Sequence, residues 1–441
     1  MNLIQILQQA SNWFLGWPLI VYVLSAGIMC TITLSFLQFK YFIHAWRITL
    51  FPSATAKEKK GDMTPLQAFV NTLSTNLGNG SLAGMATAVY SGGPGAAIWA
   101  VIIGFLLMSI RFAEVYISTL YGARTTKSLL GGPMLYLKGV PGGTVLSYVY
   151  GSFLLFFALI IGNAMQANSI RLSIETTWGV DRYIITTALV LLVSYIVLGG
   201  APRIIKASDR IVPIKVAVFF ISSFIVLIYH YQSLWAALVL MTKSAFSPIA
   251  FAGGVLGFTV QQAMRFGIER SIMATESGLG TAAVLFGFTG SKDPMTSGLM
   301  GMLSTFISTI VCLLVATCIV ASGVWASGAT STALTIAAFN TVFGSYGGWI
   351  VSFLSISFGI GVLVSFGYIT RAAWLFLTDG KWAWFSTVLY ILIAIFGALV
   401  NVDAIWEIGG IANGGLLVIN LFGVVYLLPV IKKSLIDNKK I

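Results

Sequence analysis

Eleven long runs of apolar residues, bounded by glycine, proline or charged residues, follow one another along the chain. They lie near residues 13–37, 64–90, 94–122, 146–170, 183–199, 209–231, 246–276, 296–323, 346–371, 383–401 and 411–431. An α-helix needs about 20 predominantly apolar residues to cross the hydrocarbon core of a bilayer. The pattern therefore predicts about eleven transmembrane helices. Of these, 64–90 and 246–276 are the least hydrophobic and the richest in glycine.

Composition indicates that lipid surrounds most of the chain. Of its 441 residues, 58% are hydrophobic and only 9% are charged, with a mean hydropathy of +0.93. In an ordinary soluble domain about 25% of the residues are charged. Cys30, Cys312 and Cys318 all lie inside apolar runs and indicate no disulfide framework. The sequence thus predicts an all-α polytopic membrane protein whose surroundings are the lipid bilayer.

The net charge of +12 is unevenly distributed. With the N-terminus outside, eighteen of the 25 lysines and arginines fall in one set of loops, and only Arg171, Arg182 and Lys243 fall in the opposite set. Basic residues accumulate in cytoplasmic loops, so this bias predicts a bacterial inner-membrane protein with its C-terminus in the cytoplasm. Because the charges are spread over short loops, nucleic acid is not expected as a partner.

Two of the predicted spans are interrupted by polar or glycine-rich sequence. The first interruption covers 75–81 (TNLGNGS), and the second covers 253–257 (GGVLG), followed by Gln261 and Gln262. If the first span is set aside, the other ten form two sets of five, and each set begins with an interrupted helix. Five is odd, so the sets enter the membrane from opposite sides, which predicts an inverted repeat. The predicted divisions are an N-terminal helix and loop at 1–63, a first repeat at 64–231, and a second repeat with a cytoplasmic tail at 232–441.

An interruption inside a membrane must be lined by protein or water, because lipid cannot satisfy bare backbone groups. An unwound segment offers N–H groups to a carboxylate and C=O groups to a cation or an ammonium group. The alternative interpretation is that the glycines allow close helix packing, as in the small-xxx-small spacing of Gly80 and Gly84.

Several collinear motifs resemble the alanine/glycine:cation symporter family and cover nearly the whole chain. They are 78–88, 92–95, 111–114, 132–134, 162–163, 166–169, 265–267, Arg270, 276–280, Trp406, 413–414 and Asn420. The resemblance implies a five-plus-five inverted-repeat, LeuT-like fold with one extra N-terminal helix. It also implies uptake of a small neutral amino acid together with a cation, without a resident cofactor.

The resemblance carries the family's substrate residues onto specific positions of this chain. These are Gly78, Asn79, Gly80, Ser81, Gln166, Gly253, Gly254 and Gly257. The family usually has Thr at positions 76 and 79 and Asn at position 81, where this chain has Asn76, Asn79 and Ser81. Hydrogen-bonding capacity is retained but the pocket volume changes, so the exact amino acid is left open.

The expected cation site departs further from the family. The family usually has a Thr-Thr pair and then a Trp where this chain has Ile360, Gly361 and Ser365, and an apolar residue at position 215. A hard cation needs several oxygen ligands, and two hydroxyls are lost here. We therefore predict a coupling site made of Asn76, Lys215, Gly361 and Ser365, in which the Lys215 ammonium replaces sodium. Three possibilities for the coupling charge remain open: sodium, a proton carried by Lys215, and a permanently charged Lys215. It also remains open whether Lys215 instead snorkels to the interface.

The other ionisable residues inside the spans have simpler interpretations. Arg111 and Glu114 are three apart on one predicted helix, which favours a structural pair over a proton relay. Glu269, Arg270 and Glu276 are interpreted as either a gate or a solvated helix end. An intramembrane enzyme is not expected, because no HExxH motif and no nucleophile with a matching base are present. A channel would favour repeated pore loops over two dissimilar broken helices. Stoichiometry and oligomeric state are left open.

Overall fold

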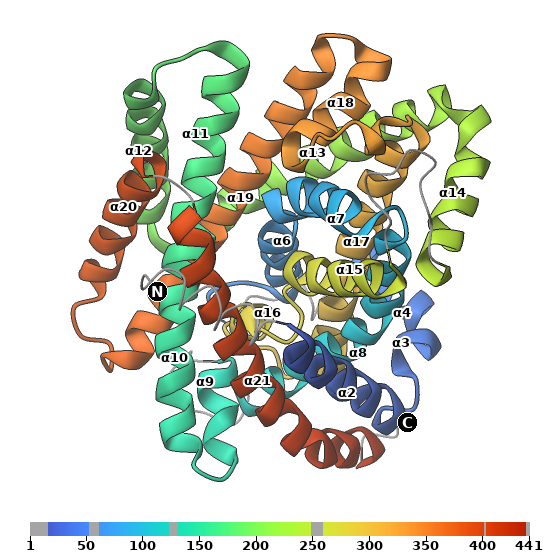
Figure 1. Ribbon diagram of the computed structural model, residues 1–441. Coiled ribbons are helices and arrows are strands. Elements are labelled where there is room, and N and C mark those ends of the chain that lie inside the picture. Colours follow the sequence, from blue (N-terminus) through green and yellow to red (C-terminus); the bar gives the residue numbers. More distant parts are fainter. Residues whose placement is uncertain (1–15, 53–60, 123–130, 248–258, 401–402, 438–441) are drawn as a thin grey trace, which may run out of the picture.

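The computed structural model describes residues 16–52, 61–122, 131–247, 259–400 and 403–437. Throughout these residues the secondary structure is helical, with short turns between the helices (Figure 1). In chain order the elements are α2 (Trp17–Thr33), α3 (Leu37–Lys40), α4 (Phe42–Leu50), α6 (Pro65–Asn76), η1 (Gly80–Gly84), α7 (Met85–Gly92), α8 (Ala96–Gly122), α9 (Pro133–Tyr136), η2 (Leu137–Gly139), α10 (Gly143–Leu159), η3 (Ile160–Ala164), α11 (Met165–Trp178), α12 (Arg182–Leu198), α13 (Gly200–Tyr229), α14 (Tyr231–Phe246), α15 (Val260–Thr275), α16 (Thr281–Gly287), α17 (Pro294–Ala321), η4 (Val324–Ala326), α18 (Ser331–Phe343), α19 (Tyr346–Leu377), α20 (Ala383–Leu399) and α21 (Asp403–Asp437).

Six helical stretches in the described part of the chain are long and apolar enough to cross a membrane. They are Ala96–Gly122, Gly143–Trp178, Gly200–Tyr229, Pro294–Ala321, Tyr346–Leu377 and Gly409–Asp437. Four shorter apolar helices accompany them: Trp17–Thr33, Arg182–Leu198, Ser331–Phe343 and Ala383–Leu399. Each of the eleven predicted segments coincides with one or more helices over most of the residues that the structure describes. The number of spans itself stays a prediction.

Large apolar side chains on the outer helices are exposed. Leu198 on α12, Ile228 on α13 and Leu392 on α20 are 67%, 69% and 55% exposed. Figure 1 shows α12 and α20 side by side at one edge of the molecule and α14 at the opposite edge. Exposed apolar surface of this extent is typical of contact with lipid.

The centre of the molecule is built from helices of both halves of the chain. α15, α16 and α17 pack around α8, and α19 contacts α6, α10, α11 and α13 (Figure 1). The interrupted helix α6 therefore lies in the interior, between α13, α17 and α19. The predicted counterpart of its interruption, 253–257, lies outside the described residues, so the inverted repeat stays a prediction.

Helices of 16 and 13 residues, α14 and α18, lie in connections that the apolar runs do not mark, and α18 packs against α19 and η1. The Thr335 hydroxyl on α18 donates to the Leu82 carbonyl of η1 at 3.4 Å. The connection after α17 thus covers the segment just beyond the interruption of the second span.

Candidate functional site

The second predicted span is interrupted near its middle. α6 begins with a capping box, in which Thr64 and Gln67 satisfy each other's backbone N–H groups. It ends at Asn76, and Leu77 leaves helical geometry with φ −87° and ψ 70°. The π-helical turn η1 then resumes the span at Gly80. The ends of α6 and η1 therefore meet inside the protein, with backbone groups that lack helical partners.

The last carbonyls of α6 accept hydrogen bonds from side chains instead. The Ser81 hydroxyl donates to the Asn76 carbonyl at 3.1 Å. The Lys215 ammonium, from α13, donates to the carbonyls of Ser74 at 3.2 Å and Leu77 at 3.0 Å. Its side chain is fully buried, so Lys215 does not snorkel to the interface in this conformation.

An aromatic ring and a glycine of α19 lie close to the Lys215 ammonium. Nζ lies 5.2 Å from the centre of the Phe358 ring on α19. A Cβ added at Gly361, also on α19, would lie 2.6 Å from Nζ and 2.8 Å from the Ser74 hydroxyl oxygen. In the described part of the chain, no carboxylate forms an ion pair with Lys215. The structure thus brings Lys215 and Gly361 together at the end of α6.

A line of polar contacts, which we call the polar seam, connects the start of α6 to this point. It comprises Asp62, Gln67, Asn71, Ser208, Asp209, Ser365 and Tyr368. The Ser365 hydroxyl donates to Asn71 Oδ1 and lies 3.3 Å from both that atom and the Ser208 hydroxyl. Gln67 Nε2 donates to Asp209 Oδ2 at 3.1 Å, and the Tyr368 hydroxyl donates to Asp62 Oδ2 at 2.9 Å. Ser365 therefore belongs to the seam.

Buried polar groups from three helices meet beyond the interruption. Asn79 Nδ2 donates to Gln166 Oε1 at 3.4 Å, and the Ser355 hydroxyl on α19 donates to Asn79 Oδ1 at 2.8 Å. Gln166 Nε2 donates to the Ile161 carbonyl at 3.3 Å, within the π-helical turn η3. A Cβ added at Gly78 would lie 3.9 Å from Gln166 Oε1. The structure thus brings Gly78, Asn79 and Gln166 to one place.

Among the described residues, the glycines at 80 and 84 show no close helix packing. A Cβ added at Gly80 would meet none of these residues within 4 Å, and one at Gly84 would meet only the Arg270 side chain, at 3.6 Å. Ser81 and Asn76 lie beside them and are buried, and Asn76 Nδ2 has no hydrogen-bond partner in the described part of the chain. The described residues therefore leave one side of the chain at Gly80 uncovered, which a packing role against them does not explain.

The third glycine-rich group, Gly253, Gly254 and Gly257, lies outside the described residues. Beyond it, Gln261 and Gln262 on α15 are exposed.

The three residues of the predicted gate do not form one cluster. Glu269 and Arg270 are half-buried, and Arg270 Nη1 lies 3.6 Å from the Met273 sulfur. Glu276 ends α15 at φ 51°, is buried, and accepts a hydrogen bond from the Thr281 hydroxyl at 2.8 Å. Among the described residues neither glutamate forms an ion pair with Arg270. Glu276 is therefore not part of a solvated helix end, and the gate stays a prediction.

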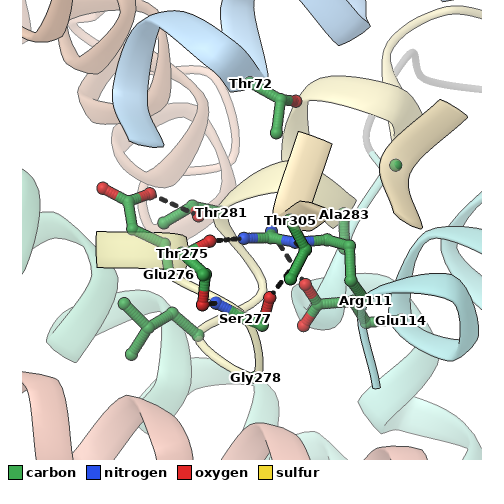
Figure 2. Close-up of polar contacts among 12 residues, drawn as sticks. Thr72, Arg111, Glu114, Thr275, Glu276, Ser277, Gly278, Thr281, Ala283 and Thr305 are labelled. Carbon is green, nitrogen blue, oxygen red and sulfur yellow. Dashed lines mark hydrogen bonds and ion pairs between the residues drawn. The ribbon is translucent and has the colours of Figure 1, made fainter. Parts of the chain in front are cut away.

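The buried pair predicted on the third span is present. Arg111 Nη1 lies 2.8 Å from Glu114 Oε1, and both side chains are fully buried (Figure 2). The guanidinium also donates to the Thr275 carbonyl and, at 3.4 Å, to the Thr305 hydroxyl. Asn420 Nδ2 donates to Glu114 Oε2 at 3.0 Å. The pair fastens α8, α15, α17 and α21 together, which confirms the pairing predicted from the spacing of three.

Several residues at the site carry no signal in the sequence. Ser74, Ser355 and Phe358 are ordinary small or aromatic residues of apolar spans, and only the packing of α19 against α6 brings them to the interruption.

A cavity of about 510 Å³ lies elsewhere, at the ends of α12 and α19, and Gly200, Ile204, Gly367 and Arg371 are among its lining residues. The described residues contain no group of His, Cys, Asp and Glu suited to a metal ion.

Comparison with known proteins supplies the family. The model of the sodium:alanine symporter family matches residues 1–440. An uncharacterized transporter of Haemophilus influenzae is 31% identical over 441 residues, covering 98% of this chain and 95% of its own. The sodium/alanine symporter AgcS of Methanococcus maripaludis is 28% identical over 443 residues, covering 98% and 96%.

A solved structure of a Na⁺-coupled sialic acid symporter shares the fold. It has a TM-score of 0.53 at 11% identity and covers 96% of this chain and 84% of its own. The architecture is thus that of LeuT-fold transporters, and the chain is a multi-pass membrane transporter rather than an enzyme. With the family model matching almost from end to end, the chain belongs to the sodium:alanine symporter family, whose members carry small amino acids together with a cation.

Proposed function

We propose that this chain is a secondary active transporter that imports a small neutral amino acid of the alanine or glycine type, bound at the interruption between α6 and η1. The observation that carries the proposal is the side of Gly80 that the described residues leave uncovered, next to the buried Asn79–Gln166 contact. A helix that ends in the protein interior offers both donors and acceptors to a zwitterion.

The two ends of the interruption suit the two charges of an amino acid. η1 begins at Gly80, so the N–H groups near Gly78 to Gly80 lie at the positive end of a helical segment and favour a carboxylate. The carbonyls at the end of α6 favour an ammonium group. Gln166, held by Asn79 and Ile161, would add one polar contact. Asn79 and Ser81 alter the pocket volume relative to the family, which leaves the exact amino acid open.

The predicted repeats at 64–231 and 232–441 fit this placement. In inverted-repeat transporters the substrate lies where two broken helices meet, and one repeat rocks against the other. The basic residues of the loops support an orientation with the N-terminus outside and the C-terminus in the cytoplasm.

Uptake into proteoliposomes tests the proposal. Labelled alanine, glycine, serine and glutamine would be supplied outside, with sodium, proton and no gradients imposed separately. At least one small neutral amino acid should accumulate above its external concentration under one of these conditions. Absence of accumulation and of exchange for all four would overturn the proposed function.

Gln166→Ala tests the placement of the substrate. Loss of a buried hydrogen-bonding group should weaken binding by about 1–3 kcal/mol, or about 5- to 150-fold in Kd. Gln232→Ala, at an exposed position on α14, is the matched control and should bind like the wild type. Unchanged binding by Gln166→Ala would remove Gln166 from the site.

A further inference from the structure

We propose that the Lys215 ammonium is a tethered cation that does the work of the coupling ion, so that transport by this chain requires Lys215 and does not require sodium. This inference rests on the proposed function, because it concerns the ion site beside the same interruption. It departs from the sodium coupling that the family name implies.

The ligands of a free cation at this point are already occupied. Carbonyl oxygens at the end of a broken helix are suitable ligands for a hard cation. The carbonyls of Ser74 and Leu77 accept hydrogen bonds from Lys215 at 3.2 and 3.0 Å. An ion bound between α6 and α19 would have to displace the ammonium from both.

At position 361 the ammonium and an additional side-chain ligand would compete for the same space. A Cβ at Gly361 would lie 2.6 Å from Lys215 Nζ, closer than side-chain atoms pack. A threonine at this position would extend its hydroxyl toward the ammonium. The present position of the Lys215 ammonium therefore depends on the absence of a side chain at 361, where an oxygen ligand would otherwise reach the end of α6.

Stability alone does not explain this lysine. A buried charge is costly, and an apolar side chain of similar length would fill the same volume without that cost. α6 and α19 present no titratable side chain to Nζ in the described structure, and the acids of the polar seam, Asp62 and Asp209, are bound to Tyr368 and Gln67. Within the described part of the chain, the charge is stabilised by the C-terminal end of α6 and by the face of Phe358. This is the arrangement expected for a cation that acts on the interruption itself.

The first test uses the purified wild-type protein without substrate. Its thermal unfolding is measured in NaCl and in choline chloride at equal ionic strength. The proposal predicts the same midpoint in both salts. A sodium-specific rise in the midpoint would show that the protein binds the free ion and would overturn the proposal, whether or not any amino acid is transported.

The second test measures uptake into proteoliposomes of whichever small amino acid the wild type transports. Uptake should differ by less than twofold between sodium and choline, and Lys215→Met should lose at least tenfold. Lys206→Met, at an exposed position on the same helix, should retain wild-type uptake. Sodium-dependent uptake by the wild type, or unchanged uptake by Lys215→Met, would overturn the proposal.

A third variant keeps the proposal testable if Lys215→Met fails to fold. Lys215→Ala combined with Gly361→Thr removes the ammonium and restores a hydroxyl in the space it leaves. The proposal predicts a sodium-specific stabilisation of this variant that the wild type lacks. If the wild type takes up amino acid in response to an inward proton gradient, Lys215 acts as a proton carrier. If the wild type only exchanges amino acids, Lys215 acts as a fixed charge. Both results support a tethered cation, whereas equal sodium responses in the variant and the wild type contradict it.

When all four amino acids fail to enter, the proposed function fails while the unfolding measurements still decide on sodium. When an amino acid enters only with sodium, the proposed function stands and the tethered cation fails. The two conclusions are therefore tested separately.

Discussion

The protein buries two cationic side chains in opposite circumstances. Arg111 has Glu114 at 2.8 Å, and its guanidinium also donates to Thr275 and Thr305. Lys215 has no acidic partner in the described structure, and donates to two backbone carbonyls at the end of a broken helix. Both side chains are fully buried.

This difference in charge balance distinguishes the region around Arg111, which we expect to stay fixed, from the region around Lys215, which we expect to change conformation. The charges of Arg111 and Glu114 are balanced by each other and by hydrogen bonds from α15, α17 and α21, so their partners remain satisfied only while these helices stay together. The ligands of Lys215 belong to the helix end at which we propose that the substrate binds, so a bound substrate would act on their geometry. A balanced pair stabilises the structure, whereas an unbalanced charge leaves the site responsive.

The largest expected effect breaks the balanced site. Arg111→Met leaves Glu114 buried without its cation, which should cost about 3–5 kcal/mol of stability. Thermal or denaturant unfolding in detergent, together with the yield of monodisperse protein, measures this loss.

The matched control removes both charges. Arg111→Met combined with Glu114→Leu should recover most of the stability lost in the single variant, because no buried charge then lacks a partner. A double variant as unstable as Arg111→Met would show that the pair acts through its hydrogen bonds to other helices rather than through charge balance.

A smaller effect is expected from crowding the unbalanced site. Gly361→Ala places a Cβ 2.6 Å from Lys215 Nζ and should displace the ammonium from at least one carbonyl. A charge-assisted hydrogen bond is worth about 1.5–3 kcal/mol, so uptake should fall by about ten- to a hundredfold. Gly348→Ala on the same helix, whose Cβ would meet only Ile336 at 3.7 Å, should leave uptake unchanged. Equal uptake by the two variants would mean that the position of the ammonium does not matter.

Ser355→Ala should have a weaker effect on the substrate side of the interruption. It removes the donor to Asn79 Oδ1 at 2.8 Å and leaves Asn79 less firmly oriented. Substrate affinity should fall by about 1 kcal/mol, or about fivefold. Ser357→Ala, whose hydroxyl donates only within its own helix to Leu354, is the control. Equal affinity in both variants would separate Asn79 from the binding site.

The smallest effect is expected for an ion pair at the surface. Arg171 pairs with Glu175 one turn along α11, and both are partly exposed. Arg171→Met should change stability by about 0–1 kcal/mol, because water screens such pairs. A loss as large as that of Arg111→Met would mean that burial is not what distinguishes the pairs.

Sequence patterns predicted the features that depend on neighbouring residues. The interruption after Asn76 follows from the glycines at 78 and 80, and the Arg111–Glu114 pair follows from helical spacing, because both are local. The helices α14 and α18 were not predicted, because a segment must be both apolar enough and long enough to be predicted as a transmembrane span. These two helices do not meet both conditions. The resemblance, rather than any pattern, supplied Gln166 as a site residue.

Features that depend on tertiary packing could not be predicted in the same way. The acceptors of Lys215 are backbone carbonyls, which every residue has, so no residue type at 74 or 77 marks them. The contact between Ser355 and Asn79 joins positions more than 270 residues apart. Only the relative position of α6, α13 and α19 reveals these partners.

The attachment of α6 to α13 has a mechanical consequence. The two helices are joined at two levels, by Gln67 with Asp209 and by the Ser74 and Leu77 carbonyls with Lys215. Six or seven residues separate the levels, or about 10 Å of helix axis at 1.5 Å per residue. Two points of attachment fix both the distance and the angle between two helices. We therefore expect α6, the first half of the broken span, to move with α13 as one rigid unit. If the span bends at Leu77, η1 and α7 then move relative to α6 and α13 together.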